Sequence, residues 1–241
     1  MKLIKAIPNT ITSFNLFFGC LSILFVMKGD PSLAGWMIFC AAVCDFFDGF
    51  SASLLHAKSK MGVELDSLAD VVSFGVAPGF ILYSLMELSH GRRSYIVFEQ
   101  LDLFLLLAFL LPIFAALRLA KFNVDTRQTA SFIGLPTPAM AIFVASLPII
   151  RQYLYESQSF TYQVFTNNYL YIAIAVVFSL LMVSNIPFFS FKSLRFKWKG
   201  NEFRWIFITI ALVLLVWLQV LAVPFIMLVY FLISLVIMLV N

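Results

Sequence analysis

Charge is scarce in this chain: only 12% of its 241 residues are Asp, Glu, Lys or Arg. A soluble globular domain carries about 25% of such residues, so a water-exposed surface of ordinary composition is excluded. Apolar residues make up 62% of the sequence, and the mean hydropathy is +1.00. Long apolar runs therefore predict a polytopic membrane protein of the all-α class, embedded in a lipid bilayer.

The chain is also poor in residues that bind soft metals or form disulfides. Its three cysteines, Cys20, Cys40 and Cys44, fall in apolar stretches without ligand spacing, which favours small buried side chains. No internal repeat stands out, so an inverted-repeat transporter gains no support. The net charge is +4, but the basic residues gather at segment ends, which indicates contact with lipid headgroups and no nucleic-acid partner.

Eight segments are long and apolar enough to predict spanning helices. They lie at about 11–27, 33–55, 66–86, 102–122, 134–153, 168–185, 205–221 and 223–240. The first is expected to be a retained span and not a signal peptide, because polar residues interrupt its apolar run and no small-residue cleavage site follows. The last two come from one apolar run too long for a single crossing, and Gln219 and Pro224 mark the expected turn.

Basic residues predict the orientation in the membrane. With eight spans both termini lie on one side, which then carries twelve of the sixteen Lys and Arg residues. The positive-inside rule places that side in the cytoplasm. Both termini and the acidic stretch described next are therefore expected to be cytoplasmic.

Acidic residues concentrate at positions 45–70, which hold five of the twelve Asp and Glu residues of the chain. Asp45 and Asp48 are three residues apart, and Asp66 and Asp70 are four apart, so each pair shares one face of a helix. A helical hairpin would bring the four carboxylates together at the membrane edge. Like charges that close cannot all stay ionised unless a cation lies among them, so we predict a divalent-metal site suited to Mg²⁺ or Mn²⁺.

Small residues accompany these carboxylates. Gly49 follows the first pair directly, Ala52 comes one turn later, and Gly62 precedes the second pair by four residues. Small side chains let a bulky polar ligand approach the helix backbone, and carboxylates beside such a groove suit a diphosphate with its metal. A packing hairpin with solvated end charges would explain the glycines but not four carboxylates in two helical pairs.

The spacing of these residues resembles a family signature. Asp45-x2-Asp48-Gly49-x2-Ala52-x9-Gly62-x3-Asp66-x3-Asp70 is similar to D-x2-D-G-x2-A-R-x8-G-x3-D-x3-D of the CDP-alcohol phosphotransferase family. Every spacing matches, and one position departs from the pattern. Ser53 stands where the family has Arg, and a short hydroxyl cannot reach a phosphate as an Arg fork does.

Further stretches resemble the membrane-embedded bacterial phosphatidylserine synthases of that family. They are PNTITSFNLFFGCLSI at 8–23, ELDSLADVVSFGVAP at 64–78, ALRLAKFN at 116–123, FIGLPTPAM at 132–140 and LMVSNIPFFSFK at 181–192. The resemblance covers about residues 5–195. It implies one membrane-embedded domain over 1–241, with a six-helix core, two accessory spans at about 205–240, a bacterial inner-membrane location and a homodimer.

The resemblance also implies a reaction and a set of residue roles. CDP-diacylglycerol and L-serine would give phosphatidylserine and CMP at two metal ions, Mg²⁺ or Mn²⁺. The expected metal ligands are Asp45, Asp48, Asp66 and Asp70, and Asp70 is also the expected general base. The nucleotide is expected at Gly49, Ala52, Gly62, Asn9 and Thr12, and a substrate phosphate or carboxylate at Arg118 and Lys121.

Alternatives stay open on the sequence alone. The acceptor could be glycerol phosphate, inositol phosphate or choline in place of serine, with the same chemistry. A cation-coupled transporter also uses intramembrane carboxylates, but it predicts ion flux and tolerates loss of Gly49. Arg118 and Lys121 also fit solvated anchors at a helix end, and Asn9, Thr12 and Asn15 fit either hydrogen bonds to the nucleotide or links between helices.

Overall fold

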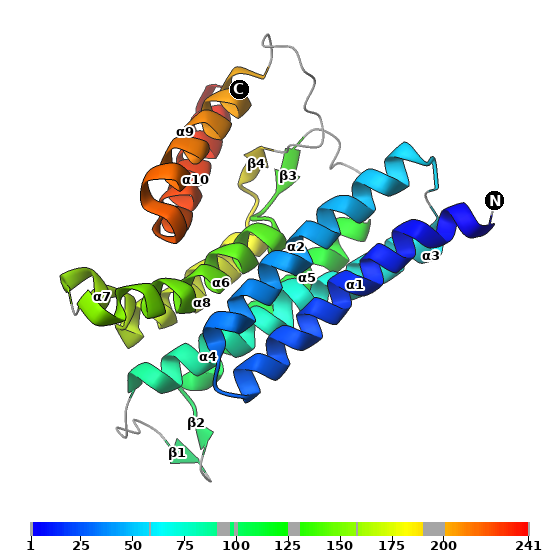
Figure 1. Cartoon of the computed structure of the whole chain (residues 1–241). Coiled ribbons are helices and arrows are strands. Elements are labelled where there is room, and N and C mark those ends of the chain that lie inside the picture. Colours follow the sequence, from blue (N-terminus) through cyan, green and yellow to red (C-terminus); the bar gives the residue numbers. More distant parts are fainter. Residues whose placement is uncertain are drawn as a thin grey trace.

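A computed structural model of the chain describes residues 2–57, 59–90, 97–98, 101–124, 131–157, 159–189 and 201–240. Within these residues the fold is an all-α bundle, as predicted (Figure 1). The helices are α1 (Lys2–Met27), α2 (Pro31–Leu54), α3 (Lys60–Val71), α4 (Ala77–His90), α5 (Leu110–Val124), α6 (Thr137–Leu154), α7 (Phe160–Phe165), α8 (Asn168–Val183), α9 (Glu202–Leu218) and α10 (Ala222–Val240). Two short antiparallel ribbons join them: β1 (Val97–Phe98) with β2 (Leu101–Asp102), and β3 (Ser131–Ile133) with β4 (Pro187–Phe189).

Each of the eight predicted spans is largely helical, and the chain is a multi-pass membrane protein. By length and composition, five stretches of the described residues could cross a membrane: Ala6–Met27, Pro31–Leu54, Lys60–Ser89, Leu105–Val124 and Glu202–Met238. The predicted boundaries were wrong at three starts: α1 begins at Lys2 and not near 11, α3 at Lys60 and not near 66, and the segment expected from 102 becomes helical only at Leu105, with α5 from Leu110. At the first two of these starts, the helix extends into a stretch with polar residues, which a spanning helix can hold near its ends.

Local signals in the sequence set where α2 and α3 begin. Before α2, the Oδ1 atom of Asp30 accepts a hydrogen bond from the backbone N of Leu33 at 2.9 Å, and Pro31 occupies the first turn. Before α3, the Oγ atom of Ser59 accepts one from the backbone N of Gly62 at 3.0 Å. These caps fix the ends of the two helices that carry the acidic residues.

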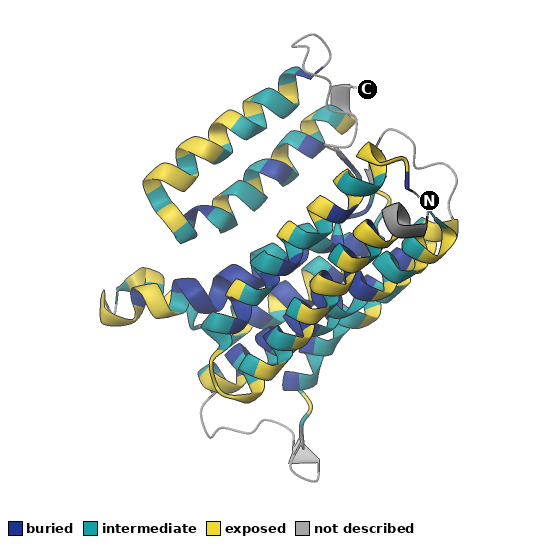
Figure 2. Ribbon diagram, turned by 45° about the vertical axis from the view of Figure 1, so that its right-hand side comes forward, coloured by how far each residue is buried: buried dark blue, intermediate teal, exposed yellow. Residues whose placement is uncertain are grey.

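Small residues allow the helices of the core to approach one another closely. A Cβ atom added at Gly35 of α2 would lie 2.3 Å from the carbonyl oxygen of Ala145 in α6. One added at Gly19 of α1 would lie 2.4 Å from the Oγ atom of Ser73. Because lipid tails are as apolar as the side chains, such close packing stabilises helix association in a membrane. Figure 2 shows the buried residues gathered where these core helices face one another.

The helix geometry changes between Lys60 and His90, because α3 ends at Val71, one residue after Asp70. Residues Val72–Val76 form a π-helical turn between α3 and α4, a rare feature that is frequent at functional sites. The wider turn rotates the residues of α4 relative to those of α3. No pattern in the sequence predicts this turn.

The last two helices form a hairpin that turns where the sequence predicts (Figure 1). Gln219 has a φ of 50° and begins a single 3₁₀ turn, and Pro224 lies in the first turn of α10, where its missing N–H costs little. Phe188 of β4 is fully buried, and its ring stacks on that of Tyr230 in α10 at a centroid distance of 5.5 Å. The ribbon β3–β4 therefore anchors the hairpin to the core.

Large apolar side chains cover the outer faces of the bundle, as expected for helices surrounded by lipid. Phe46 of α2 is 68% exposed, and Trp217 near the tip of the hairpin is 85% exposed. Cys20 is exposed, and Cys40 and Cys44 are half-buried, so the expectation that all three cysteines are buried was wrong. Several basic residues that predict the orientation, including Arg92 and those at 192–199, lie outside the described residues.

Candidate metal centre

The acidic stretch folds as a helical hairpin, with Asp45 and Asp48 in α2 and Asp66 and Asp70 in α3. One carboxylate oxygen from each of Asp45, Asp48 and Asp66 lies within 4.8 Å of the other two. Oxygens bound to one Mg²⁺ ion lie about 3–4 Å apart, because each sits about 2.1 Å from the metal. Small side-chain rotations would thus let all three reach one cation.

Burial makes the charge of this cluster costly. Asp48 is 5% exposed, and no donor in the described part of the chain reaches its Oδ2 atom. A buried ionised carboxylate without compensation is unfavourable, and two further carboxylates beside it add repulsion. An all-carboxylate donor set is the one that hard divalent cations prefer. The residues present therefore fit a divalent cation.

Asp70 lies one turn beyond Asp66 and has different surroundings. It is 8% exposed, and its Oδ1 atom accepts a hydrogen bond from the Nδ2 atom of Asn15 in α1 at 3.1 Å. The backbone oxygen of Asn15 in turn accepts one from the Ser73 hydroxyl at 3.0 Å. Asn15 therefore does link helices, and it holds Asp70 beside the three-carboxylate group with which Asp70 interacts electrostatically.

One face of α1 turns toward the acidic hairpin. The Oδ1 atom of Asn9 would lie 2.9 Å from a Cβ added at Gly62, so these two residues adjoin each other across α1 and α3. One turn further, the buried Thr12 donates its hydroxyl to its own helix and lies against the carboxyl of Asp48. Together with Asn15, these side chains line the hairpin with hydrogen-bonding groups.

Gly49 of α2 differs from Gly62 in having open space beside it. A Cβ added at Gly49 would meet no atom within 4 Å, and Gly49 is exposed. Ala52, one turn later, is half-buried, and Ser53 is exposed. The surface of α2 next to the carboxylates is thus accessible to a ligand, whereas Gly62 serves close contact between helices.

The structure gives the two predicted cations different positions. Arg118 of α5 is 6% exposed and interacts electrostatically with Asp70 and with Tyr230 of α10. Lys121, one turn later, is exposed. Burying a guanidinium is expensive unless acceptors surround it, so Arg118 is the better candidate for holding an anionic group of a substrate.

Tyr230 of the last span, which interacts electrostatically with Arg118, was not predicted from the sequence. Its phenol lies in the apolar run that forms α10, with no motif or charged neighbour to mark it. The only available signal was a polar side chain inside an otherwise apolar span, which is weak for an amphipathic residue such as tyrosine.

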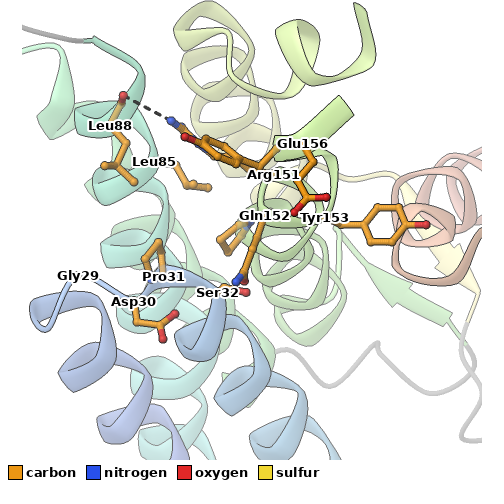
Figure 3. A pocket seen from close by; sticks show the side chains of 12 residues that line it. Gly29, Asp30, Pro31, Ser32, Leu85, Leu88, Arg151, Gln152, Tyr153 and Glu156 are labelled. Carbon is orange, nitrogen blue, oxygen red and sulfur yellow. Dashed lines mark hydrogen bonds between the residues drawn. The ribbon is translucent and has the colours of Figure 1, made fainter. Parts of the chain in front are cut away.

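A separate pocket of about 860 Å³ opens at the opposite end of the bundle, between the α1–α2 turn and the ends of α4 and α6 (Figure 3). Arg151 lines it and donates to the Oγ atom of Ser89 at 2.7 Å and to the backbone oxygen of Leu88 at 3.5 Å. Asp30 and Glu156 supply its acidic groups. None of the residues predicted for the metal or substrates lines it, so it is distinct from the metal centre.

Comparisons with known proteins identify the family to which the chain is similar. Residues 5–187 match the family model described as CDP-alcohol phosphatidyltransferase, a region that includes the acidic hairpin and ends before α9. Three similar curated proteins carry the name CDP-diacylglycerol–serine O-phosphatidyltransferase. That of Helicobacter pylori is 34% identical over 208 residues, covering 86% of this chain and 80% of its own. That of Bacillus subtilis is 36% identical over 187 residues, covering 77% and 91%, and that of Methanocaldococcus jannaschii is 31% identical over 189 residues, covering 78% and 76%.

Proposed function

Because the chain belongs to the CDP-alcohol phosphatidyltransferase family, we propose that it transfers the phosphatidyl group of CDP-diacylglycerol to L-serine, giving phosphatidylserine and CMP. The observation that carries the chemistry is the convergence of carboxylate oxygens from Asp45, Asp48 and Asp66 within 4.8 Å of one another. Serine as the acceptor is supported by the names of relatives that align over most of both chains.

The reaction forms a bond between the serine hydroxyl oxygen and the β-phosphorus, while the bond from that phosphorus to the CMP oxygen breaks. Asp45, Asp48 and Asp66, with Asp70 beside them, would hold the Mg²⁺ or Mn²⁺ ions, two in number by the family resemblance. When bound, these ions neutralise the diphosphate and the charge that develops on the departing CMP.

Asp70 is the proposed acceptor of the serine hydroxyl proton. The Asn15 amide donates to one of its oxygens, which fixes the direction of the carboxyl and leaves the other oxygen able to accept a proton. The transfer needs no Ser, Cys or His nucleophile. We therefore expect one direct displacement without a covalent enzyme intermediate.

The remaining predicted residues surround this centre. We propose that the open surface at Gly49 and Ala52 receives the cytidine diphosphate, with Asn9 and Thr12 at its margin and Gly62 keeping α3 close to α1. Arg118 holds an anionic group, either a phosphate of the lipid nucleotide or the serine carboxylate. Lys121, being exposed, would act at the entrance to the site.

The proposed location is the inner membrane of a bacterium, with both termini and the metal centre facing the cytoplasm. The support is the distribution of Lys and Arg, twelve of sixteen on the side of the termini. Cysteines introduced singly at positions 58, 92 and 197 test this orientation in intact cells. Only the cysteine at 92 should react with an impermeant thiol reagent. Labelling at 58 or 197 would indicate the opposite orientation. A homodimer is expected from the family resemblance alone.

The acceptor is tested with purified protein and CDP-diacylglycerol, by following CMP release with serine, glycerol phosphate, inositol phosphate or choline. Serine alone should support turnover, and Asp48→Asn should abolish it. Turnover with another alcohol but not with serine would keep the chemistry and change the product. Cation flux into liposomes without any CMP release would instead favour a cation-coupled transporter.

A further inference from the structure

Tyr230 is a buried polar side chain in the last span, and the hairpin holds its ring from two sides. The side chain is 7% exposed. Its ring stacks on Phe188 of β4 at 5.5 Å and meets Phe207 of α9 edge-on at 5.8 Å. Contacts of this kind fix the plane of an aromatic ring, so the ring packing sets the direction of the hydroxyl.

The phenol of Tyr230 interacts electrostatically with Arg118 of α5. Arg118 is itself buried and also interacts with Asp70 of the acidic hairpin. A guanidinium can only donate hydrogen bonds, whereas a phenol oxygen can accept them. Arg118 therefore interacts electrostatically with a polar group of the C-terminal hairpin and with a carboxyl group of the acidic hairpin.

We infer that Tyr230 is a positioning residue for Arg118, holding the guanidinium where it meets the anionic group of a substrate. This rests on the proposed function, because it assigns Arg118 to substrate binding. The match to the family model ends at residue 187, so the residue comes from a part of the chain beyond that region. The C-terminal hairpin then contributes to substrate binding in addition to anchoring the chain in the membrane.

The test measures the KM of each of the two substrates separately. Arg118→Lys first shows which of them Arg118 binds, since that substrate should have a raised KM. Tyr230→Phe removes only the hydroxyl and keeps the ring between Phe188 and Phe207. If the phenol oxygen accepts a hydrogen bond from the Arg118 guanidinium, this variant should raise the KM of the same substrate about tenfold and change kcat less than about twofold.

A double variant shows whether Tyr230 acts through Arg118. If it does, Tyr230→Phe should add no further loss in the Arg118→Lys background, because the group that it positions has already been replaced. Phe207→Ala provides an independent variant, since it loosens the ring without touching the hydroxyl. It should raise the same KM by a smaller factor.

Tyr171→Phe is the matched control. Tyr171 is fully buried in α8, donates its hydroxyl to the backbone oxygen of Phe165 and interacts with Arg151 at the opposite end of the bundle. Losing this hydroxyl should lower the unfolding temperature in detergent and leave both KM values unchanged.

The inference is overturned if Tyr230→Phe has the wild-type KM, if Tyr171→Phe raises the KM equally, or if the losses in the double variant multiply. All constants are measured with whichever alcohol supports CMP release, so a wrong acceptor assignment leaves this test intact. Absence of CMP release with every alcohol would refute the proposed function, and this inference with it.

Discussion

The core helices and the C-terminal hairpin are both apolar and helical, yet they use burial differently. In the core, side chains such as Ile38, Phe74 and Leu82 are fully buried, and glycines let the backbones touch. No residue of α9 is buried, and few of α10 are (Figure 2). Helices of similar apolar composition can therefore pack against protein or face lipid. Small and polar residues indicate the helix faces that pack against protein.

The largest effect is expected at the carboxylates of the core. Asp66→Asn removes one charge from the three-carboxylate cluster and should lower CMP release at least about 100-fold, because several kcal/mol of charge stabilisation depend on the metal. Asp30→Asn is the control: it makes the same change at the start of α2, where Asn caps a helix as well as Asp. Equal activity losses in the two variants would mean that charge removal acts only through folding.

The second largest difference between the core and the C-terminal hairpin is expected in how far a changed side chain lowers the stability of the protein. Gly35→Val places side-chain atoms where the Ala145 carbonyl oxygen already lies, and we expect it to destabilise the protein by about 3 kcal/mol or more. Trp217→Ala, on the lipid-facing side of the hairpin, should leave the unfolding temperature within about one degree of wild type, as exposed sites usually do. Thermal unfolding in detergent measures both, and a greater loss at Trp217 would reverse the comparison.

A smaller effect, on binding alone, is expected at Gly49. Gly49→Ala meets no atom within 4 Å, so the unfolding temperature should not fall. If the nucleotide approaches this surface, the KM for CDP-diacylglycerol should rise about tenfold, because an extra methyl group would crowd the ligand. An unchanged KM would remove Gly49 from the nucleotide site and would suit the transporter alternative.

The smallest effect is expected at the hairpin turn. Gln219 has a φ of 50°, which favours glycine. Gln219→Gly should therefore stabilise the protein by up to about 1 kcal/mol, seen as a slightly higher unfolding temperature with unchanged turnover. A lower unfolding temperature would show that the Gln219 side chain matters more than the backbone angle.

The sequence was sufficient to predict the helices and the acidic hairpin because both depend on short-range patterns. Hydropathy located the spans, and the spacing of Asp45 and Asp48 placed them on one face of α2. The turn at Gln219 followed from the length of one apolar run.

Contacts between distant segments could not be predicted in the same way. The approach of Tyr230 to Arg118 depends on how β4 anchors the hairpin, and the π-helical turn after Asp70 depends on packing against α1 and α5. Asn15 illustrates the limit well. Its position in the first span was noted from the sequence, but two roles were open until its hydrogen bond to Asp70 was seen.

The central claim is that Asp45, Asp48 and Asp66 hold the divalent cation on which transfer to serine depends. Its most direct test measures bound Mn²⁺ and serine-dependent CMP release on the same purified sample, before and after chelation and in Asp66→Asn. The account predicts that chelation abolishes both, that added Mn²⁺ restores both together, and that the variant has neither. Serine-dependent CMP release that persists in the chelated protein or in Asp66→Asn would contradict it.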